Sequence, residues 1–204
     1  MIGIVGCGKI GECVAYYLAK DYDIKIIDSN KNKTDFLLLA QKGFSQNEII
    51  ANNEKLDIKD CDLVISALPY FENLELASKC IALGIDYLDF GGNKDVSDKI
   101  EQEYTKYGQE SVVFCNLGLA PGFVNIVAEH LADLDCKSID LNCGGLSHDD
   151  DNILKYGITW SLDGLYNEYT GKTNIIHDGK IQERQALNDE EEFVTDQLYG
   201  EYSC

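Results

Sequence analysis

The sequence predicts an α/β protein: a Rossmann-type, doubly wound parallel sheet with a second, smaller and incomplete α+β domain. Three observations carry this prediction. An apolar run at residues 2–5 leads directly into a Gly-x-Gly-x-x-Gly motif, strand and helix signals then alternate as far as residue 115, and the later part of the chain changes to a hairpin pattern. Alternating strands and helices indicate a parallel sheet covered on both faces. We expect the domains to span residues 1–120 and 121–204.

The opening motif is typical of a loop that binds a dinucleotide. Gly6 permits the tight turn out of the first strand, Gly8 lets the backbone approach a pyrophosphate, and Gly11 lets the next helix pack close to the strand. Lys9 and Ile10 open that helix, whose first N–H groups face the phosphates. The alternative, a glycine-rich turn without a dinucleotide, lacks an explanation for the residues that follow.

The second expected strand, residues 23–27, ends in an acidic residue. Asp28 lies close to the offset of about 20 residues at which an acid binds the ribose hydroxyls. Ser29 follows it and joins the expected cofactor site. Because a carboxylate repels a 2′-phosphate and no arginine lies nearby, we expect NAD rather than NADP.

The other elements follow from periodicity and from turn residues. Strands are expected at residues 48–50, 63–68, 86–90, 112–115 and 139–142, and helices at residues 34–43, 74–84, 96–107, 124–131 and 161–169. A hairpin with an Asp-Gly turn is expected at residues 175–181. Glu75 and Lys79 are spaced as a solvated i, i+4 ion pair on one helix.

Charge and cysteine content exclude several classes of function. The formal net charge of the 204 residues is -19 and Arg184 is the only arginine, which argues against nucleic acid and membrane surfaces as partners. The eight cysteines form no Cys-x-x-Cys pair and accompany no histidine cluster, so we expect reduced thiols, no metal site and a cytoplasmic protein. His148 lies in an acidic loop that reads as solvated rather than metal-binding. The N-terminal apolar run reads as a strand rather than a signal peptide.

Three expected strand ends carry residues suited to a binding site. They are Ala67-Leu68-Pro69-Tyr70, Asp89-Phe90-Gly91-Gly92-Asn93 and Leu117-Gly118-Leu119-Ala120-Pro121-Gly122. Ligands of open α/β sheets bind beyond the carboxyl ends of the strands, so all three should converge near the nicotinamide half of a dinucleotide. Tyr70 and Asp89 are our candidate catalytic residues, since a phenol or a carboxylate can accept or relay an amine proton. The alternatives are an ordinary turn aromatic for Tyr70 and a cap of the glycine turn for Asp89.

These stretches, in this order, resemble the saccharopine dehydrogenase-like family, which includes saccharopine reductases, lysine 6-dehydrogenases and carboxynorspermidine dehydrogenases. The resemblance continues through Gly144-Gly145-Leu146, through residues 152–169 with Trp160-Ser161, and through Asp178-Gly179-Lys180. It implies hydride transfer between a nicotinamide and a carbon bonded to nitrogen in an amino-acid or polyamine-like substrate. It also implies that Pro69, Tyr70 and residues 119–122 face the cofactor, and that the substrate meets four side chains: Asn125, Tyr156, Trp160 and Ser161.

One departure from the family pattern keeps a second function open. Residues 192–198 resemble a point from which family members continue much further, whereas this chain stops at Cys204. The alternative to an enzyme is therefore a non-catalytic dinucleotide-binding protein or a shortened remnant of one. A sheet left incomplete in the second domain exposes an edge or an apolar face, so we expect a homodimer formed through that domain.

Overall fold

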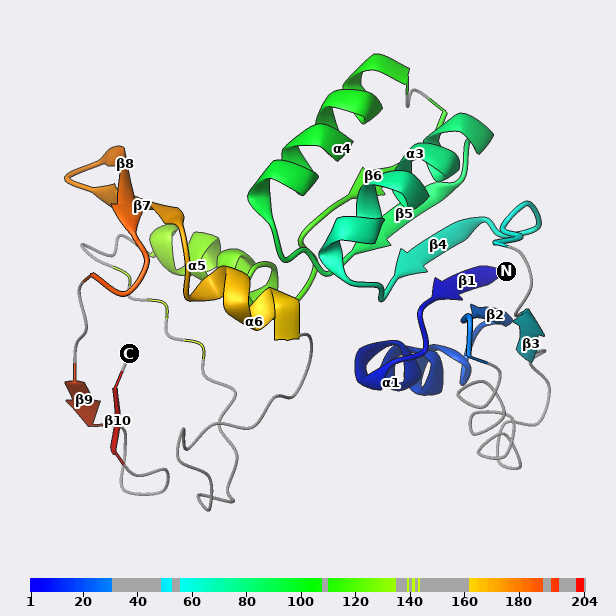
Figure 1. Ribbon diagram of the computed structural model, residues 1–204, viewed down its shortest axis with the longest axis horizontal. Helices are drawn as coiled ribbons and strands as arrows, with labels where there is room; N and C mark the ends of the chain where they lie inside the picture. The colour runs from blue at the N-terminus through cyan, green and yellow to red at the C-terminus, as the bar shows by residue number, and fades with distance from the viewer. Residues whose placement is uncertain are drawn as a thin grey trace. The chain divides into compact units, whose positions relative to one another are not determined.

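The computed structural model describes residues 1–30, 49–52, 56–107, 110–134, 139, 141, 143, 162–188, 192–194 and 201–203. The chain divides into two compact units, Met1–Ser161 and Leu162–Cys204 (Figure 1). The expected domain boundary at residue 120 stays a prediction. The expected helix at residues 34–43 lies outside the described residues.

The first unit contains a parallel sheet of six strands, as expected. The strands are β1 (Ile2–Val5), β2 (Ile24–Ile27), β3 (Ile49–Asn52), β4 (Leu63–Ser66), β5 (Asp86–Asp89) and β6 (Val113–Phe114). Their order is β3-β2-β1-β4-β5-β6 and every neighbouring pair is parallel. The order reverses direction between β1 and β4, which is where an open α/β sheet binds its ligand, beyond the carboxyl ends of the strands.

Helices cover both faces of this sheet (Figure 1). They are α1 (Lys9–Leu18), α3 (Asn73–Leu83) and α4 (Lys94–Tyr107), and a short 3₁₀ turn, η2 (Tyr70–Glu72), precedes α3. A further helix, α5 (Phe123–Ala132), follows β6 and has no buried residue. Alternate residues of β1 face opposite sides. Ile4 packs with Ala15 of α1, whereas Val5 packs with Leu76 of α3 and Ile100 of α4. The two apolar clusters confirm the doubly wound arrangement.

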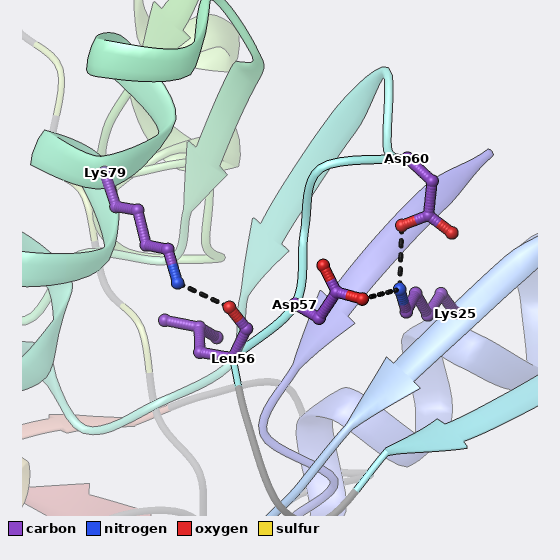
Figure 2. Close-up of polar contacts among 5 residues, drawn as sticks. All are labelled: Lys25, Leu56, Asp57, Asp60 and Lys79. Atoms are coloured by element: carbon purple, nitrogen blue, oxygen red, sulfur yellow. Dashed lines mark hydrogen bonds and ion pairs between the residues drawn. The ribbon is translucent and has the colours of Figure 1, made fainter.

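The segment that leads into β4 is held by two lysines (Figure 2). Lys25 of β2 has a side chain only 4% exposed, and its Nζ lies 2.7 Å from Asp60 Oδ1 and 3.5 Å from Asp57 Oδ2. Burial lowers the pKa of Lys25, but hydrogen bonding and charge from these aspartates outweigh it, so the pKa is raised. Lys79 donates to the Leu56 carbonyl. The expected solvated pair of Lys79 with Glu75 is thus wrong, because this lysine reaches a backbone acceptor on the neighbouring segment.

The second unit holds a short helix and two small antiparallel sheets. These elements are α6 (Leu162–Glu168), β7 (Lys172–His177), β8 (Lys180–Gln185), β9 (Glu192–Val194) and β10 (Glu201–Ser203). Asp178 and Gly179 both have positive φ, 51° and 70°, which is the turn expected for an Asp-Gly hairpin. The strand expected at residues 139–142 is not confirmed: Ile139 and Leu141 lie in no strand, and residues 140 and 142 lie outside the described residues.

Candidate functional site

The glycine-rich loop between β1 and α1 has the geometry that its sequence predicts. Gly6 has φ +91°, and a Cβ added there would lie 2.8 Å from the Ala67 carbonyl oxygen. A Cβ added to Gly11 would lie 1.9 Å from the Gly6 carbonyl oxygen. A Cβ added to Gly8 would meet nothing within 4 Å. Gly6 and Gly11 therefore permit close backbone packing, whereas Gly8 leaves open space at the N-terminus of α1, a position that favours anions.

Asp28, at the end of β2, faces this loop. Its Oδ2 accepts a hydrogen bond from the Cys7 N–H at 2.6 Å, and its Oδ1 accepts one from the Asn30 N–H at 2.7 Å. The carboxylate therefore ties the end of β2 to the glycine-rich loop. Ser29, the next residue, is exposed, as are Lys9 and Ile10 at the start of α1.

The three strand ends singled out in the sequence do meet at one edge of the sheet. The Leu117 N–H donates to the Asp89 carbonyl at 2.8 Å. A Cβ added to Gly92 would lie 3.1 Å from the Cβ of Tyr70, which places the loop after β5 against the loop after β4. A Cβ added to Gly118 would lie 2.9 Å from the Phe90 carbonyl oxygen. Backbones this close bring all three loops into one surface beyond the carboxyl ends of β4, β5 and β6.

The two candidate catalytic residues lie in different environments. Tyr70 opens η2 directly after Pro69, is half-buried, and packs edge-to-face on Phe71 at 5.6 Å between ring centroids. Asp89 is 1% exposed. Its Oδ1 accepts from the N–H groups of Gly91 at 2.8 Å and Asn116 at 3.0 Å, and its Oδ2 accepts from the Tyr87 hydroxyl at 3.1 Å. The geometry supports a role of Asp89 in holding the loops, and direct proton transfer by it stays a prediction.

The loop after β6 presents an apolar surface. Leu119 is 60% exposed, the Ala120-Pro121 peptide bond is cis, and Gly122 bridges back to Gly118. The Gly122 N–H donates to the Asn125 Oδ1 at 2.9 Å, so the oxygen of this expected substrate residue serves the start of α5. Three further expected substrate residues lie outside the described residues: Tyr156, Trp160 and Ser161. The binding roles of these side chains, and of Ala67, Leu68 and Pro69 in the loop after β4, stay predictions.

Sequence reasoning missed the buried residues beneath these loops. Tyr87 is fully buried, and its hydroxyl lies 3.4 Å from the Asn73 carbonyl oxygen as well as near Asp89. The Ser66 hydroxyl donates to the Asn73 Oδ1 at 2.7 Å. A usable signal was present, because Tyr87 and Asp89 are two residues apart in a strand and so point to one face.

The described residues were searched for a metal site and for a membrane-spanning helix. Among them, no three His, Cys, Asp or Glu side chains are grouped closely enough to hold a metal ion. Across the same residues, no helix has the length and apolar character needed to span a bilayer.

Two protein-family models match the sequence. The saccharopine dehydrogenase NADP binding domain matches residues 2–114, and the saccharopine dehydrogenase C-terminal domain matches residues 118–201. The first match covers the parallel sheet and the glycine-rich loop. The second begins at the turn between β6 and α5.

Curated relatives and a solved structure agree with these matches. Saccharopine dehydrogenase [NADP(+), L-glutamate-forming] of Saccharomyces cerevisiae is 27% identical over 191 residues, which is 88% of this chain and 42% of the yeast protein. The mitochondrial alpha-aminoadipic semialdehyde synthase of Bos taurus is 27% identical over 192 residues, 87% of this chain and 20% of that protein. The apo saccharopine dehydrogenase (L-Glu forming) structure from yeast has a TM-score of 0.65 at 18% identity and covers 98% of this chain and 48% of that chain. This chain thus spans less than half the length of these relatives.

The expectation of NAD as cofactor is not supported by these comparisons. The matched domain and the yeast relative are both named for NADP. In the structure, both oxygens of Asp28 accept backbone hydrogen bonds within the protein, so the carboxylate serves as part of the loop's framework.

Proposed function

The chain belongs to the saccharopine dehydrogenase family, and from this premise we propose that it binds NADP(H) and takes part in hydride transfer at a carbon bonded to nitrogen. The observation that carries the proposal is the combination at one sheet edge of a glycine-rich loop with open space at Gly8 and three converging strand-end loops. The substrate that we propose is an amino acid with a secondary amine, with saccharopine as the first to test.

The cofactor-binding part of the proposal uses the residues of the first unit. The pyrophosphate would lie against the backbone at Gly8 and the N-terminus of α1, since the N–H groups of a first helical turn and the helix dipole favour an anion. Pro69 and Tyr70 would border the nicotinamide half together with Leu119. When bound, NADP⁺ accepts a hydride. The chain itself supplies the surface that orients the reacting carbon toward that acceptor.

Oxidation of a secondary amine also requires that a proton leave the nitrogen as the C=N bond forms. The substrate carbon loses a hydride and the nitrogen loses a proton, which gives an imine that water can hydrolyse. Tyr70 is the candidate to relay this proton, because it is half-buried at the loop edge rather than enclosed. The chain's net charge of -19 favours a substrate that carries positive charge at its amine.

One observation favours a second function, dinucleotide binding without turnover. Asp89, the other candidate proton acceptor, is 1% exposed and hydrogen-bonded on both oxygens. A chain that binds NADPH but lacks an accessible proton acceptor would act as a binding protein rather than as an enzyme.

The test combines a binding titration with a turnover assay. The protein is titrated with NADPH and NADH at one salt concentration, and is then incubated with saccharopine and NADP⁺ while NADPH fluorescence is followed. NADPH formation supports the enzyme. NADPH binding without formation selects the second function, and failure to bind either dinucleotide contradicts both.

A further inference from the structure

We propose that Tyr87 and Asp89 are positioning residues, which together set the loops that receive the nicotinamide half of the cofactor. The inference rests on the proposed function and deepens it. Asp89 acts here through the backbone that it holds, and Tyr87 acts through Asp89.

The Asp89 carboxylate joins two of the three loops directly. Its Oδ1 accepts from the N–H groups of Gly91 and Asn116, which follow β5 and β6 respectively. Both donors have positive φ, 80° at Gly91 and 64° at Asn116. A non-glycine residue rarely adopts that conformation without a local reason, and the hydrogen bond to Asp89 supplies one at Asn116.

Tyr87 fixes the other oxygen of this carboxylate and connects it to the loop after β4. The Tyr87 hydroxyl lies 3.1 Å from Asp89 Oδ2 and 3.4 Å from the carbonyl oxygen of Asn73, the first residue of α3. The Asn73 side chain in turn accepts from Ser66, at the end of β4. One buried chain of polar contacts therefore runs beneath all three strand ends.

Side chains of α4 and of the segment after β6 add to this network around Asp89 and Asn116. The Ser97 hydroxyl donates to the Asn116 Oδ1 at 3.1 Å. Burial, and after it the charge of Asp89, raises the pKa of the Cys115 thiol, which places this side chain near the carboxylate. Burial and the charge of Asp89 likewise raise the pKa of Tyr87, which keeps its hydroxyl protonated as a donor. A buried polar network with its members hydrogen-bonded is rigid and specifies one arrangement of the backbone.

The adenosine half of the site is held by a different set of contacts. There, Asp28 accepts from the Cys7 and Asn30 N–H groups, and Gly11 packs against Gly6. The two halves of a dinucleotide would consequently depend on separate supports. Loss of the Asp89 contacts should weaken binding of the nicotinamide half and leave the adenosine half unaffected.

The experiment compares Asp89→Asn and Tyr87→Phe with the wild type, and uses Tyr107→Phe as control. Tyr107 is 63% exposed on α4, so this control makes the same chemical change away from the network. The probes are NADPH and adenosine 2′,5′-bisphosphate, which carries the adenosine half alone. Backbone amide hydrogen exchange is measured at Gly91 and Asn116, with the amides of β1 as the internal reference.

We expect Asp89→Asn to lower NADPH affinity by about tenfold, the scale of one lost buried hydrogen bond to a charged group, with less than about a twofold change for adenosine 2′,5′-bisphosphate. Exchange at Gly91 and Asn116 should rise by about tenfold or more while the β1 amides are unchanged. Tyr87→Phe should act in the same direction and more weakly, because the bonds to Oδ1 remain.

The opposite results are distinguishable from a failure of the proposed function. Equal loss of affinity for both probes, or faster exchange throughout the sheet, would overturn the inference, because it would show general destabilisation. Unchanged exchange at Gly91 and Asn116 would overturn it too. If the wild type binds no NADPH, the proposed function fails, and the positioning role is then judged by amide exchange alone.

Discussion

Adding a single methyl group at two glycines of the same loop should have opposite consequences, and this pair of variants tests the cofactor site without assuming catalysis. A Cβ at Gly8 meets nothing within 4 Å, whereas a Cβ at Gly11 lies 1.9 Å from the carbonyl oxygen of Gly6. Gly8→Ala should therefore fold normally and lose dinucleotide affinity. Gly11→Ala should lose stability first.

The size of each effect follows from these surroundings. For Gly11→Ala, overpacking against backbone costs about 3 kcal/mol, the upper part of the usual range. Alanine regains about 1 kcal/mol of helix propensity, so a net loss of about 2 kcal/mol is expected. For Gly8, which has φ -80° at the N-cap of α1, alanine gains about 0.5 kcal/mol of chain entropy and loses a similar amount as a poorer cap. The stability of Gly8→Ala should thus stay within about 0.5 kcal/mol of the wild type.

Urea denaturation measures the free energy of unfolding for both variants, and NADPH fluorescence measures affinity in the folded state. Gly8→Ala should weaken NADPH binding by about tenfold or more, because the methyl group occupies space that the pyrophosphate needs, and the larger side chain of Gly8→Val should abolish it. Wild-type NADPH affinity in a folded Gly8→Ala protein would refute the proposal that the pyrophosphate occupies the space beside Gly8. A loss of stability at Gly8 equal to that at Gly11 would refute the packing argument.

Four further predictions follow from the same structure. The pKa of Asp60 is lowered, chiefly by the hydrogen bond from Lys25, and a lowered carboxylate pKa adds stability above about pH 4 that is lost as pH falls through the folded value. Lys25→Met should therefore lower the free energy of unfolding more at about pH 7 than at about pH 3. A difference that does not depend on pH would contradict this. Lys79→Met should lower the free energy of unfolding by about 1 kcal/mol, whereas Lys99→Met at an exposed position of α4 should change it little, so equal effects would remove the role of the Leu56 carbonyl. NADPH should bind more tightly than NADH in titrations at one salt concentration, and the reverse order would restore the expectation drawn from the sequence. Light scattering at micromolar concentration should detect a homodimer, and a clean monomer would count against it.

Much of the fold could be read from local sequence patterns. The run Ile2–Val5 followed by Gly6, Gly8 and Gly11 predicted both β1 and the start of α1. Glycines at this spacing permit the tight turn after the strand and the close packing of the next helix, and this combination is typical of the Rossmann fold. Gly84 correctly marked the end of α3, where its φ of +67° forms the C-cap. These signals depend on neighbours in the chain, which is why one sequence sufficed.

What the sequence could not supply were contacts between residues distant along the chain. Lys79 lies one turn from Glu75, yet it bonds to Leu56 on a segment 23 residues earlier. For Asp89 the sequence left two roles open, proton acceptor or cap of the glycine turn, and it gave no sign of the donors that tertiary packing brings from Tyr87 and from Asn116, 27 residues later. Local spacing favours the nearest partner, whereas the folded chain supplies better ones from elsewhere.

The measurement that tests the central claim most directly is a map of backbone amide chemical shifts during titration with NADPH. The account predicts shifts at Gly8 and Gly11, at Gly91, and around Leu119, which together trace the carboxyl edge of the sheet from β1 to β6. The chemical shifts of reference amides in α4, such as that of Lys106, should not change. Saturable shifts confined to α4 or to the hairpin at residues 172–185, or no shifts at all, would contradict the claim that this edge is a dinucleotide site.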